Sequence, residues 1–427
     1  MASAGRVWAV WGVGVLAYVV AVLHRTSFGV AGLEAAKRFD AAPASLAGFV
    51  VLQLLVYGAL QVPGGLLLDR LGPRRVLVIG GLLMAGGQAL LAVATGFPLA
   101  ITGRVLVGAG DAVTFISVLR LVSGWFPPRR VPLMTQLTGL VGQLGQILSA
   151  VPLLALLYRD GWSAAFGSAA ALGLLAVVLV AVVVRDPPLR DAPAEPTTAL
   201  HGLRRSWSET GTRLGMWTHI GTQFSANVFA LLWAVPFLVA GQGLTPSEAG
   251  SLLTLLVLTG LGFGPLFGEF IARHPLRRSS LVLLVIGLTA TAWTAVLALP
   301  QPVPRWLLVV LVLVLALGAP GSMIGFDYAR TFNPEHRQGS AVGLVNMSGF
   351  LVTLLVALAI GVVLDAAGGY TPEAFRLAWS VQYVVWVVAG FGVWSTRQRA
   401  RRELAAQGTV VTPMREVIAR RRNRGRR

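Results

Sequence analysis

The stretch Gly65-Leu66-Leu67-Leu68-Asp69-Arg70-Leu71-Gly72-Pro73-Arg74-Arg75 lies between two long apolar segments, and a second version of it begins 203 residues later. The second version reads Gly268-Glu269-Phe270-Ile271-Ala272-Arg273-His274-Pro275-Leu276-Arg277-Arg278. In each version an Arg follows the first Gly by five residues, and an Arg-Arg pair ends the stretch. Two copies of one membrane hairpin predict a chain of two related halves. Such repeats are typical of transporters, whose substrate site lies between the halves.

The composition is that of a membrane protein. The 427 residues are 55% hydrophobic and only 12% charged, with a mean hydropathy of +0.73, whereas soluble proteins carry about 25% charged residues. The first apolar run starts near Val7. We expect it to be retained, because it is too long for a signal peptide and no A-x-A-like cleavage site follows it. Cysteine is absent, which excludes disulfides, thiolate catalysis and Cys–metal sites.

Apolar runs long enough to cross a bilayer, about 20 residues each, predict twelve transmembrane helices. They cover residues 7–33, 44–68, 76–95, 99–124, 131–157, 163–184, 214–240, 248–270, 279–299, 305–329, 339–364 and 373–396. No segment alternates polar and apolar residues as a membrane β-barrel requires. We therefore expect an all-α membrane protein with two six-helix bundles, 1–184 and 214–397, a cytoplasmic linker at 185–213 and a basic cytoplasmic tail at 398–427.

Charge predicts the orientation and the surroundings. Arg is concentrated in the loops after the second, fourth, sixth, eighth and tenth spans, which places both termini in the cytoplasm by the positive-inside rule. We expect a multi-pass protein of the cell membrane that acts as a monomer. Residues 397–427 hold eleven Arg and two Glu, and this tail is expected to lie on anionic lipid head groups. The net charge of +18 is no reason to expect nucleic acid as a partner, because basic density alone is a weak sign.

The 6+6 arrangement with Gly65…Asp69-Arg70…Gly72…Arg74-Arg75 between the second and third spans resembles the major facilitator superfamily. His24-Arg25-Thr26-Ser27 is similar to the Asp-Arg-x-Asn-x-Ser signature of its anion:cation symporter family, which includes carriers of sugar acids and sialin-like transporters. Arg104-x6-Asp111 with Gly108 and Gly110, Trp125-Phe126-Pro127-Pro128 and Gly161-Trp162 also resemble that family. His24 and Asp111 depart from it, since an acid and a Glu are usual at these positions. The chain lacks the Gly-Pro-x-x-Gly-Gly motif typical of proton-coupled drug antiporters.

Charges deep in a bilayer are the best candidates for function, because each costs about 2.5–3.5 kcal/mol to insert. Arg25 and Arg104 are such residues, and Asp111 lies seven residues after Arg104 on the same helical face, about 10 Å deeper. We expect the two guanidiniums to share this one carboxylate, which leaves one positive charge for an anionic substrate. Asp111 is the expected proton carrier, with His24 as a second titrating group. Structural roles are the alternative for both. The buried Arg–Asp ion pair would then only dock the fourth span against the first, and His24 would only form a hydrogen bond to a neighbouring helix.

Polar stripes supply further candidates for substrate binding. Gln53 and Tyr57 recur with Gln61 every four residues in the second span, and Gln223 and Asn227 recur with His219 in the seventh. Such stripes line water-filled cavities or bond across helices. The resemblance implies a cytoplasmic gate at the repeated motif, where the second copy has Ala272 in place of the acid. The expected gate residues are Gly65, Asp69, Arg70, Gly72, Arg74, Arg75, Arg120, Arg273 and Arg330.

These observations predict a secondary transporter that works by alternating access, with proton-coupled symport of a small organic anion as the main hypothesis. An exporter of drugs or other amphiphiles, a nitrate-like inorganic anion carrier and a transport-dead membrane sensor are the alternatives. No P-loop, H-E-x-x-H motif or catalytic triad is present, so we expect neither an enzyme nor ATP-driven transport, and no cofactor or metal.

Overall fold

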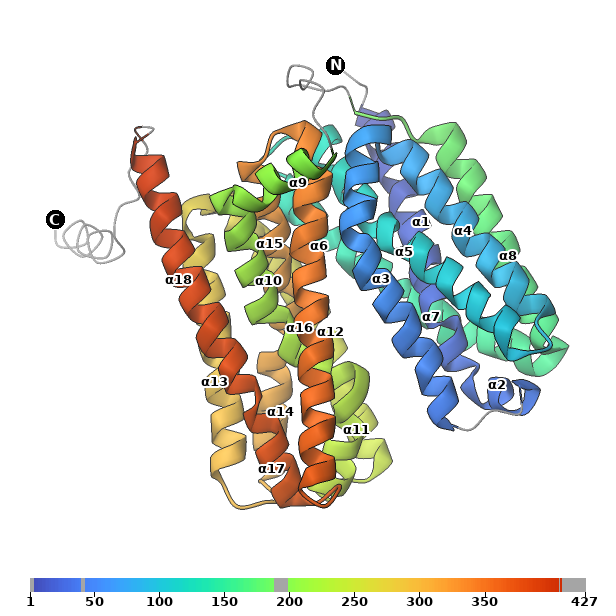
Figure 1. The fold of residues 1–427 in the computed structure, drawn as a ribbon, viewed down its shortest axis with the longest axis vertical. Helices are drawn as coiled ribbons and strands as arrows, with labels where there is room; N and C mark the ends of the chain where they lie inside the picture. Colours follow the sequence, from blue (N-terminus) through green and yellow to red (C-terminus); the bar gives the residue numbers. More distant parts are fainter. Residues whose placement is uncertain (1–3, 40–42, 188–198, 407, 409–427) are drawn as a thin grey trace.

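The computed structural model describes residues 4–39, 43–187, 199–406 and 408, and these residues form helices without any strand. Two bundles stand side by side (Figure 1). The first helix, α1 (Ala4–Val30), begins and the last helix, α18 (Gln382–Ala406), ends at the same end of the molecule, which is called below the end that carries the termini. The first bundle consists of α1 (Ala4–Val30), α2 (Gly32–Phe39), α3 (Pro43–Leu71), α4 (Pro73–Val93), α5 (Phe97–Trp125), α6 (Val131–Gly142), α7 (Leu144–Leu148), the π-helix η1 (Ser149–Leu153) and α8 (Leu154–Val183).

The second bundle follows α9 (Ala199–Ser208), which lies in the predicted linker. It consists of α10 (Thr210–Val228), η2 (Phe229–Trp233), α11 (Ala234–Pro236), η3 (Phe237–Gly241), α12 (Pro246–Arg273), η4 (Pro275–Arg277), α13 (Arg278–Ala298), α14 (Arg305–Leu315), α15 (Gly318–Phe332), η5 (Glu335–Arg337), α16 (Gln338–Ala366), α17 (Pro372–Ser380) and α18 (Gln382–Ala406). Because α18 continues to Ala406, the first residues of the predicted basic tail are helical. Residues 407 and 409–427 of that tail lie outside the described residues.

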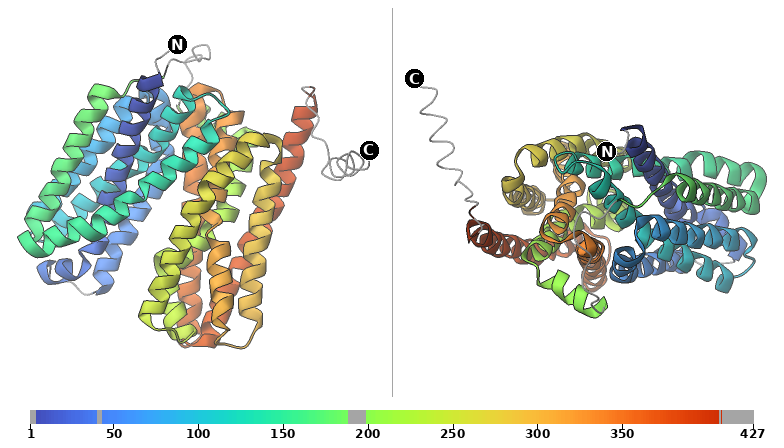
Figure 2. Two further views of the ribbon diagram at one scale, coloured as in Figure 1. Left: turned by 180° about the vertical axis from the view of Figure 1, so that it is seen from behind. Right: turned by 90° about the horizontal axis from the view of Figure 1, so that it is seen from above.

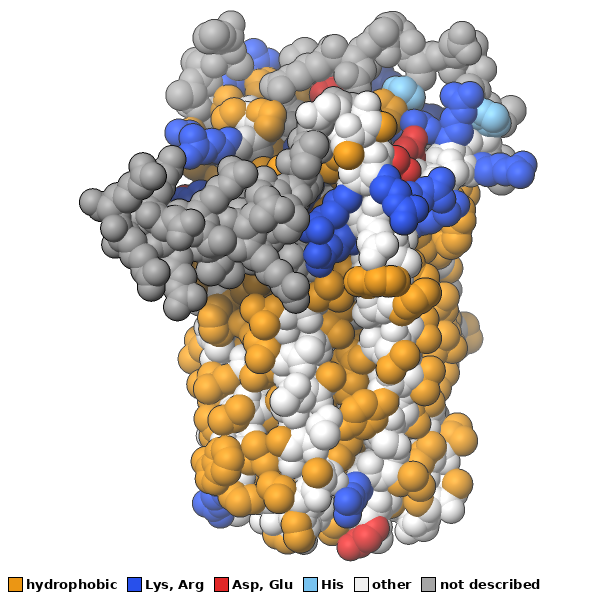
Figure 3. All heavy atoms as spheres, turned by 90° about the vertical axis from the view of Figure 1, so that its left-hand side faces the viewer, with side chains coloured by type: hydrophobic (Ala, Val, Ile, Leu, Met, Phe, Trp, Pro, Cys, Tyr) orange, Lys and Arg blue, Asp and Glu red, His pale blue; other side chains and the backbone are white. Residues whose placement is uncertain are grey.

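The described helices are compatible with twelve membrane spans. Ten helical stretches are long and apolar enough to cross a bilayer. One of them, Val131–Val183, contains two spans, because Gly161 adopts φ 85° and ψ 179° and interrupts the helix. Counting Val131–Val183 as two spans and adding α3, which has 29 residues, gives twelve spans. Figure 3 shows the side of the molecule that carries α18. Apolar side chains cover the middle of this side, and Lys and Arg side chains gather mainly above them.

Gly161 and Trp162 have a structural explanation. The positive φ of Gly161 is a conformation that only Gly adopts without strain. Directly after this break, Trp162 Nε1 donates to the Leu91 carbonyl at 2.7 Å, and Ser163 Oγ donates to the Ala92 carbonyl at 2.8 Å. The last carbonyls of a helix lack the usual donor four residues further on. The Leu91 carbonyl accepts from the Ala94 N–H at the helix end, and these two side chains supply further hydrogen bonds to Leu91 and Ala92.

The repeated motif packs each half against the other. A Cβ on Gly65 of α3 would overlap the Gly339 carbonyl of α16, and a Cβ on Gly268 of α12 would lie 2.7 Å from the Cα of Leu133 of α6. Neither position has room for a side chain, so both Gly residues let helices of opposite bundles approach closely. The left view in Figure 2 shows these bundles meeting near the end that carries the termini.

Candidate functional site

A cavity of about 490 Å³ lies between α1, α3 and the α7–η1 segment and reaches Leu231 of η2 in the second bundle. Among the residues that the structure describes, its polar lining is made by Arg25, Thr26, Gln53, Gln146 and Ser149. The Arg25 side chain is 25% exposed, so solvent reaches the cavity.

Arg25 and Asp111 form a bidentate ion pair at this cavity. Arg25 Nε donates to Asp111 Oδ2 at 2.7 Å, and Arg25 Nη2 donates to Oδ1 at 2.8 Å. The Asp111 side chain is only 1% exposed, so this carboxylate faces its partner and not the solvent. The Arg25 guanidinium also lies 5.4 Å from the centre of the Tyr57 ring, within cation–π range. Of these three residues, Arg25 lines the cavity, while Asp111 of α5 and Tyr57 of α3 are buried and contact its guanidinium.

Arg104 does not share the Asp111 carboxylate as the sequence led us to expect. It is fully buried, and its guanidinium donates to the backbone carbonyls of His24 at 3.4 Å and Arg25 at 3.1 Å. It also lies 5.1 Å from the centre of the Phe28 ring. Seven residues place Arg104 and Asp111 on one helical face, but Arg25 occupies both oxygens of the acid. Arg104 therefore holds α1 against α5 behind the cavity.

His24 points away from Arg25 and into the first bundle. Its Nε2 donates to the Ala169 carbonyl of α8 at 2.9 Å, and the side chain is fully buried. It is not part of the lining of the large cavity. This arrangement matches the structural alternative for His24 given by the sequence. Arg25 and His24 diverge because neighbouring residues on a helix point about 100° apart.

The polar stripe of α3 faces two environments. Gln53 is buried at the cavity wall. Tyr57 and Gln61 instead meet the second bundle, where Asn346 Nδ2 of α16 donates to Tyr57 Oη at 3.0 Å and to Gln61 Oε1 at 2.9 Å. Tyr57 thus contacts both Arg25 and α16, and links the ion pair to the interface between the bundles.

The second bundle contributes the stripe on α10. A Cβ on Gly349 of α16 would lie 2.9 Å from both Gln223 Oε1 and His219 Nε2, so these two polar atoms face α16. Asn227 is half-buried one turn further along, and Leu231, another turn on, lines the cavity. Gln223 and Asn227 are therefore on the stretch of α10 that leads to Leu231, but neither is among the residues that line the cavity.

Thr26, Gln146 and Ser149 line the cavity but were not among the residues predicted from the sequence. Thr26 Oγ1 and Ser149 Oγ lie 2.6 Å apart and join α1 to η1. The available signals were Thr26 next to Arg25 and Pro152 within an apolar run. That Pro lies in the π-helix η1, and π-helical turns are frequent at functional sites.

Asp69 closes the end that carries the termini. Its Oδ1 accepts a hydrogen bond from the Gly339 backbone N–H at 2.7 Å, and its Oδ2 accepts from the Ser340 N–H at 2.7 Å and from Ser340 Oγ at 2.5 Å. These groups belong to the first turn of α16, where helix N–H groups lack partners and favour a negative charge. The carboxylate of one bundle therefore caps a helix of the other.

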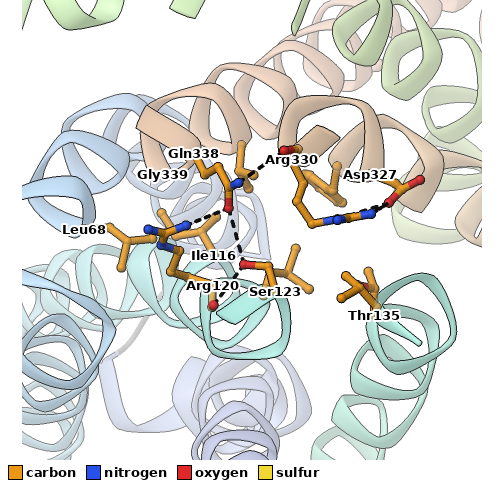
Figure 4. Close-up of a pocket in the computed structure, with 13 residues that line it drawn as sticks. Leu68, Ile116, Arg120, Ser123, Thr135, Asp327, Arg330, Gln338 and Gly339 are labelled. Atoms are coloured by element: carbon orange, nitrogen blue, oxygen red, sulfur yellow. Dashed lines mark hydrogen bonds and ion pairs between the residues drawn. The ribbon is translucent and has the colours of Figure 1, made fainter. Parts of the chain in front are cut away.

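Arg120 makes a second contact across this end. Its Nη1 donates to Gln338 Oε1 at 2.7 Å, and Ser123 Oγ donates to the same oxygen at 3.4 Å. Arg330 of the second bundle pairs with Asp327 at 2.5 Å. Figure 4 shows Arg120 and Arg330 on opposite sides of a small cavity of about 20 Å³, room for about one water molecule.

The other residues of the two motif copies lie around this end. Gly72 has φ 77° at the turn between α3 and α4. Arg74 donates through its backbone N–H to Asp186 Oδ1 at 2.8 Å and through Nη2 to the Ala181 carbonyl at 2.5 Å. Arg70 and Arg75 are exposed, and Arg273 pairs with Glu269 on the surface.

No group of three or more His, Asp or Glu side chains that could hold a metal ion occurs in the part of the chain that the structure describes. The described polar groups that line the cavity are the Arg25 guanidinium and neutral hydrogen-bonding side chains, and the Asp111 carboxylate is paired with that guanidinium.

Comparison with known proteins gives the family. Residues 14–239 and 218–424 match the profile of the Major Facilitator Superfamily. "Probable galactarate/D-glucarate transporter GudP" of Escherichia coli is 22% identical over 382 residues, covering 81% of this chain and 84% of that protein. "Probable sulfoacetate transporter SauU" of Cupriavidus necator is 22% identical over 376 residues, covering 85% and 81%.

Two solved structures share the fold. The proton:xylose symporter XylE superposes with a TM-score of 0.69 at 15% identity, covering 92% of this chain and 96% of XylE. FucP in its outward conformation superposes with a TM-score of 0.68 at 16% identity, covering 90% and 98%. These findings confirm the fold and the family predicted from the sequence. The chain belongs to the Major Facilitator Superfamily and is a multi-pass membrane transporter, not an enzyme.

Proposed function

We propose that this carrier moves a small organic anion together with a proton by alternating access. The observation that carries the proposal is the Arg25–Asp111 ion pair, in which Arg25 lines the cavity and Asp111 is buried. A guanidinium binds a carboxylate through two parallel hydrogen bonds, and Arg25 uses that geometry on Asp111. The names of the relatives GudP and SauU refer to carriers of galactarate, D-glucarate and sulfoacetate, all of them anions.

Coupling follows from competition for Arg25. A substrate carboxylate that binds Arg25 displaces Asp111 from its ion pair. The displaced acid is buried, and burial without a partner favours the neutral form of a carboxyl group. Asp111 then takes up a proton, so that one proton crosses with each substrate anion.

The proposed direction of opening rests on the two ends of the molecule. Asp69 and Gln338 hold the bundles together at the end that carries the termini, and Arg25 is accessible from the cavity. If the termini lie in the cytoplasm of a cell membrane, as loop charge predicts, this arrangement is an outward-facing form. Asp69, Gly65 and Arg120 then belong to the cytoplasmic gate.

The test is uptake by the purified protein in proteoliposomes with an acidic exterior. A thermal-shift screen of sugar acids, simple carboxylates and inorganic anions selects the substrate, because a ligand that binds only the native state stabilises it. We expect a carboxylate to accumulate with the pH difference and not without it. Export of amphiphilic cations, with no carboxylate taken up, would overturn the proposal, and accumulation of nitrate alone would replace the organic anion by an inorganic one.

A further inference from the structure

The path from Arg25 to the closed end passes a second guanidinium that the central site does not use. Arg120 lies on α5 nine residues after Asp111, which is about 13 Å along the helix axis. It lines the small cavity of about 20 Å³ between the bundles, with Arg330 on the opposite side (Figure 4). Any substrate leaving by this end passes between these two cations.

In the closed form, Gln338 of the second bundle supplies an acceptor to Arg120. Gln338 Oε1 accepts from Arg120 at 2.7 Å. The Nε2 of the same amide donates to the Arg330 carbonyl at 3.2 Å and to the Asn333 carbonyl at 3.4 Å. These two bonds tie Gln338 to the end of α15, so the amide moves with the second bundle while Arg120 moves with the first.

Separation of the bundles at this end therefore removes the amide oxygen from Arg120. An anion that enters the widened path presents a charged oxygen to the same N–H group, and such charge-assisted hydrogen bonds are stronger than those to a neutral amide. The closed cavity holds about one water, so a site for a larger anion exists only in the open form.

We propose that Arg120 is an inner anion-binding site, which Gln338 occupies with its amide oxygen when the gate is closed and which a carboxylate or sulfonate occupies when the gate is open. Arg330 contributes positive charge from the opposite side of the path. This proposal rests on the proposed function, because the anion at the inner site is the transported substrate. It goes beyond that function by adding a second binding position on the exit side.

The absence of cysteine allows a test that needs no known substrate. A single Cys replaces Ser123, whose hydroxyl lies 3.0 Å from the Arg120 carbonyl. In inside-out vesicles, the labelling rates of this thiol by an anionic and by a cationic methanethiosulfonate are compared. We expect the anionic reagent to react faster, and Arg120→Gln to lower the ratio of the two rates about tenfold, the lower end of electrostatic steering.

Two further variants serve as controls for this ratio. Arg120→Lys keeps the charge and should keep the ratio. Arg399→Gln removes an exposed Arg of α18 near the same end of the molecule, where it pairs with Glu403, and should leave the ratio unchanged. A ratio that Arg120→Gln does not alter, or that Arg399→Gln lowers equally, would overturn the inner site.

A second measurement separates this proposal from the function on which it rests. Half-saturating concentrations of D-glucarate are determined at each face in right-side-out and inside-out vesicles. Arg120→Gln should raise the value at the inner face several-fold more than at the outer face. If D-glucarate is not transported but the labelling ratio falls as expected, the anion site stands and the proposed substrate class fails. If transport is normal and neither measurement changes, only the inner site fails.

Discussion

Arg25 reaches both carboxylate oxygens of Asp111, at 2.7 and 2.8 Å, across the contact between α1 and α5. The pair lies at a cavity from which Arg25 is accessible while Asp111 is buried. An arriving anion therefore meets the guanidinium before the acid, which is the order that substrate-driven protonation requires.

Arg25→Ala should abolish carboxylate uptake while the protein still inserts and folds. Hydrogen bonds to a charged group contribute about 1.5–3 kcal/mol each, so the loss of one such bond already lowers affinity about tenfold or more. Arg25→Lys should restore little, because an ammonium lacks the two-pronged geometry. The measurement is uptake at matched protein level, with Arg159→Ala as the control, since Arg159 is an exposed Arg paired with Asp160. Near-normal uptake by Arg25→Ala would contradict the anion site.

Asp111→Asn should separate exchange from accumulation. The amide mimics a permanently protonated acid, so substrate should still exchange for substrate across the membrane but not accumulate when only a pH difference is applied. His24→Gln is the matched comparison. Because His24 bonds to the Ala169 carbonyl away from the cavity, that variant should retain pH-driven accumulation. If Asp111→Asn concentrates substrate as well as the unmodified protein, Asp111 is structural, and a loss of coupling in His24→Gln would assign the proton to the histidine.

Asp69→Asn should slow the transport cycle several-fold and leave substrate affinity within about twofold, because the three hydrogen bonds of Asp69 lie at the closed end and not at the cavity. The amide nitrogen cannot accept from the first turn of α16, and the favourable charge at the helix N-terminus is lost. Transport rate and binding affinity are measured on the same preparations. A lost affinity with an unchanged rate would exclude the gate role.

Gly65→Ala should act on the same gate by sterics alone. The added methyl group would overlap the Gly339 carbonyl, so α3 and α16 must separate and the population should shift away from the form described here. A single Cys at Ala150, which lines the large cavity, reports this shift as slower labelling by an external impermeant thiol reagent. Gly58→Ala is the control, because a Cβ there meets no atom within 4 Å. Equal labelling of the two variants would show that the contact does not govern the gate.

Arg104→Met should lower stability more than it lowers affinity. The guanidinium donates hydrogen bonds to two carbonyls of α1, and the loss of these bonds is expected to lower the free energy of unfolding by about 1–3 kcal/mol. Substrate affinity should change less, because Arg104 does not line the cavity. Thermal unfolding and substrate affinity of the folded fraction are compared with those of the unmodified protein. An unchanged unfolding temperature together with a loss of substrate affinity would assign Arg104 to substrate binding.

The sequence by itself determined the helices, the repeat and the family. The apolar runs predicted the spans, and Gly65 and Gly268 marked the repeated hairpin, because hydropathy and glycine spacing are local properties that each segment carries alone. It also identified Arg25, Asp111 and Tyr57, which the structure brings together, since charged and polar residues within an apolar span are conspicuous.

The tertiary structure decided which of these groups meet. The spacing in the sequence predicted that Arg104 pairs with Asp111. In the packed structure, Arg25 of another helix donates hydrogen bonds to both carboxylate oxygens of Asp111. It also gave Asp69 a partner at Ser340, far along the chain in the other bundle. The rotation of a helix about its axis is set by all of its neighbours, and side chains one residue apart point about 100° away from each other. No single segment contains that information, so the ion pair and the gate appear only when the two bundles are packed together.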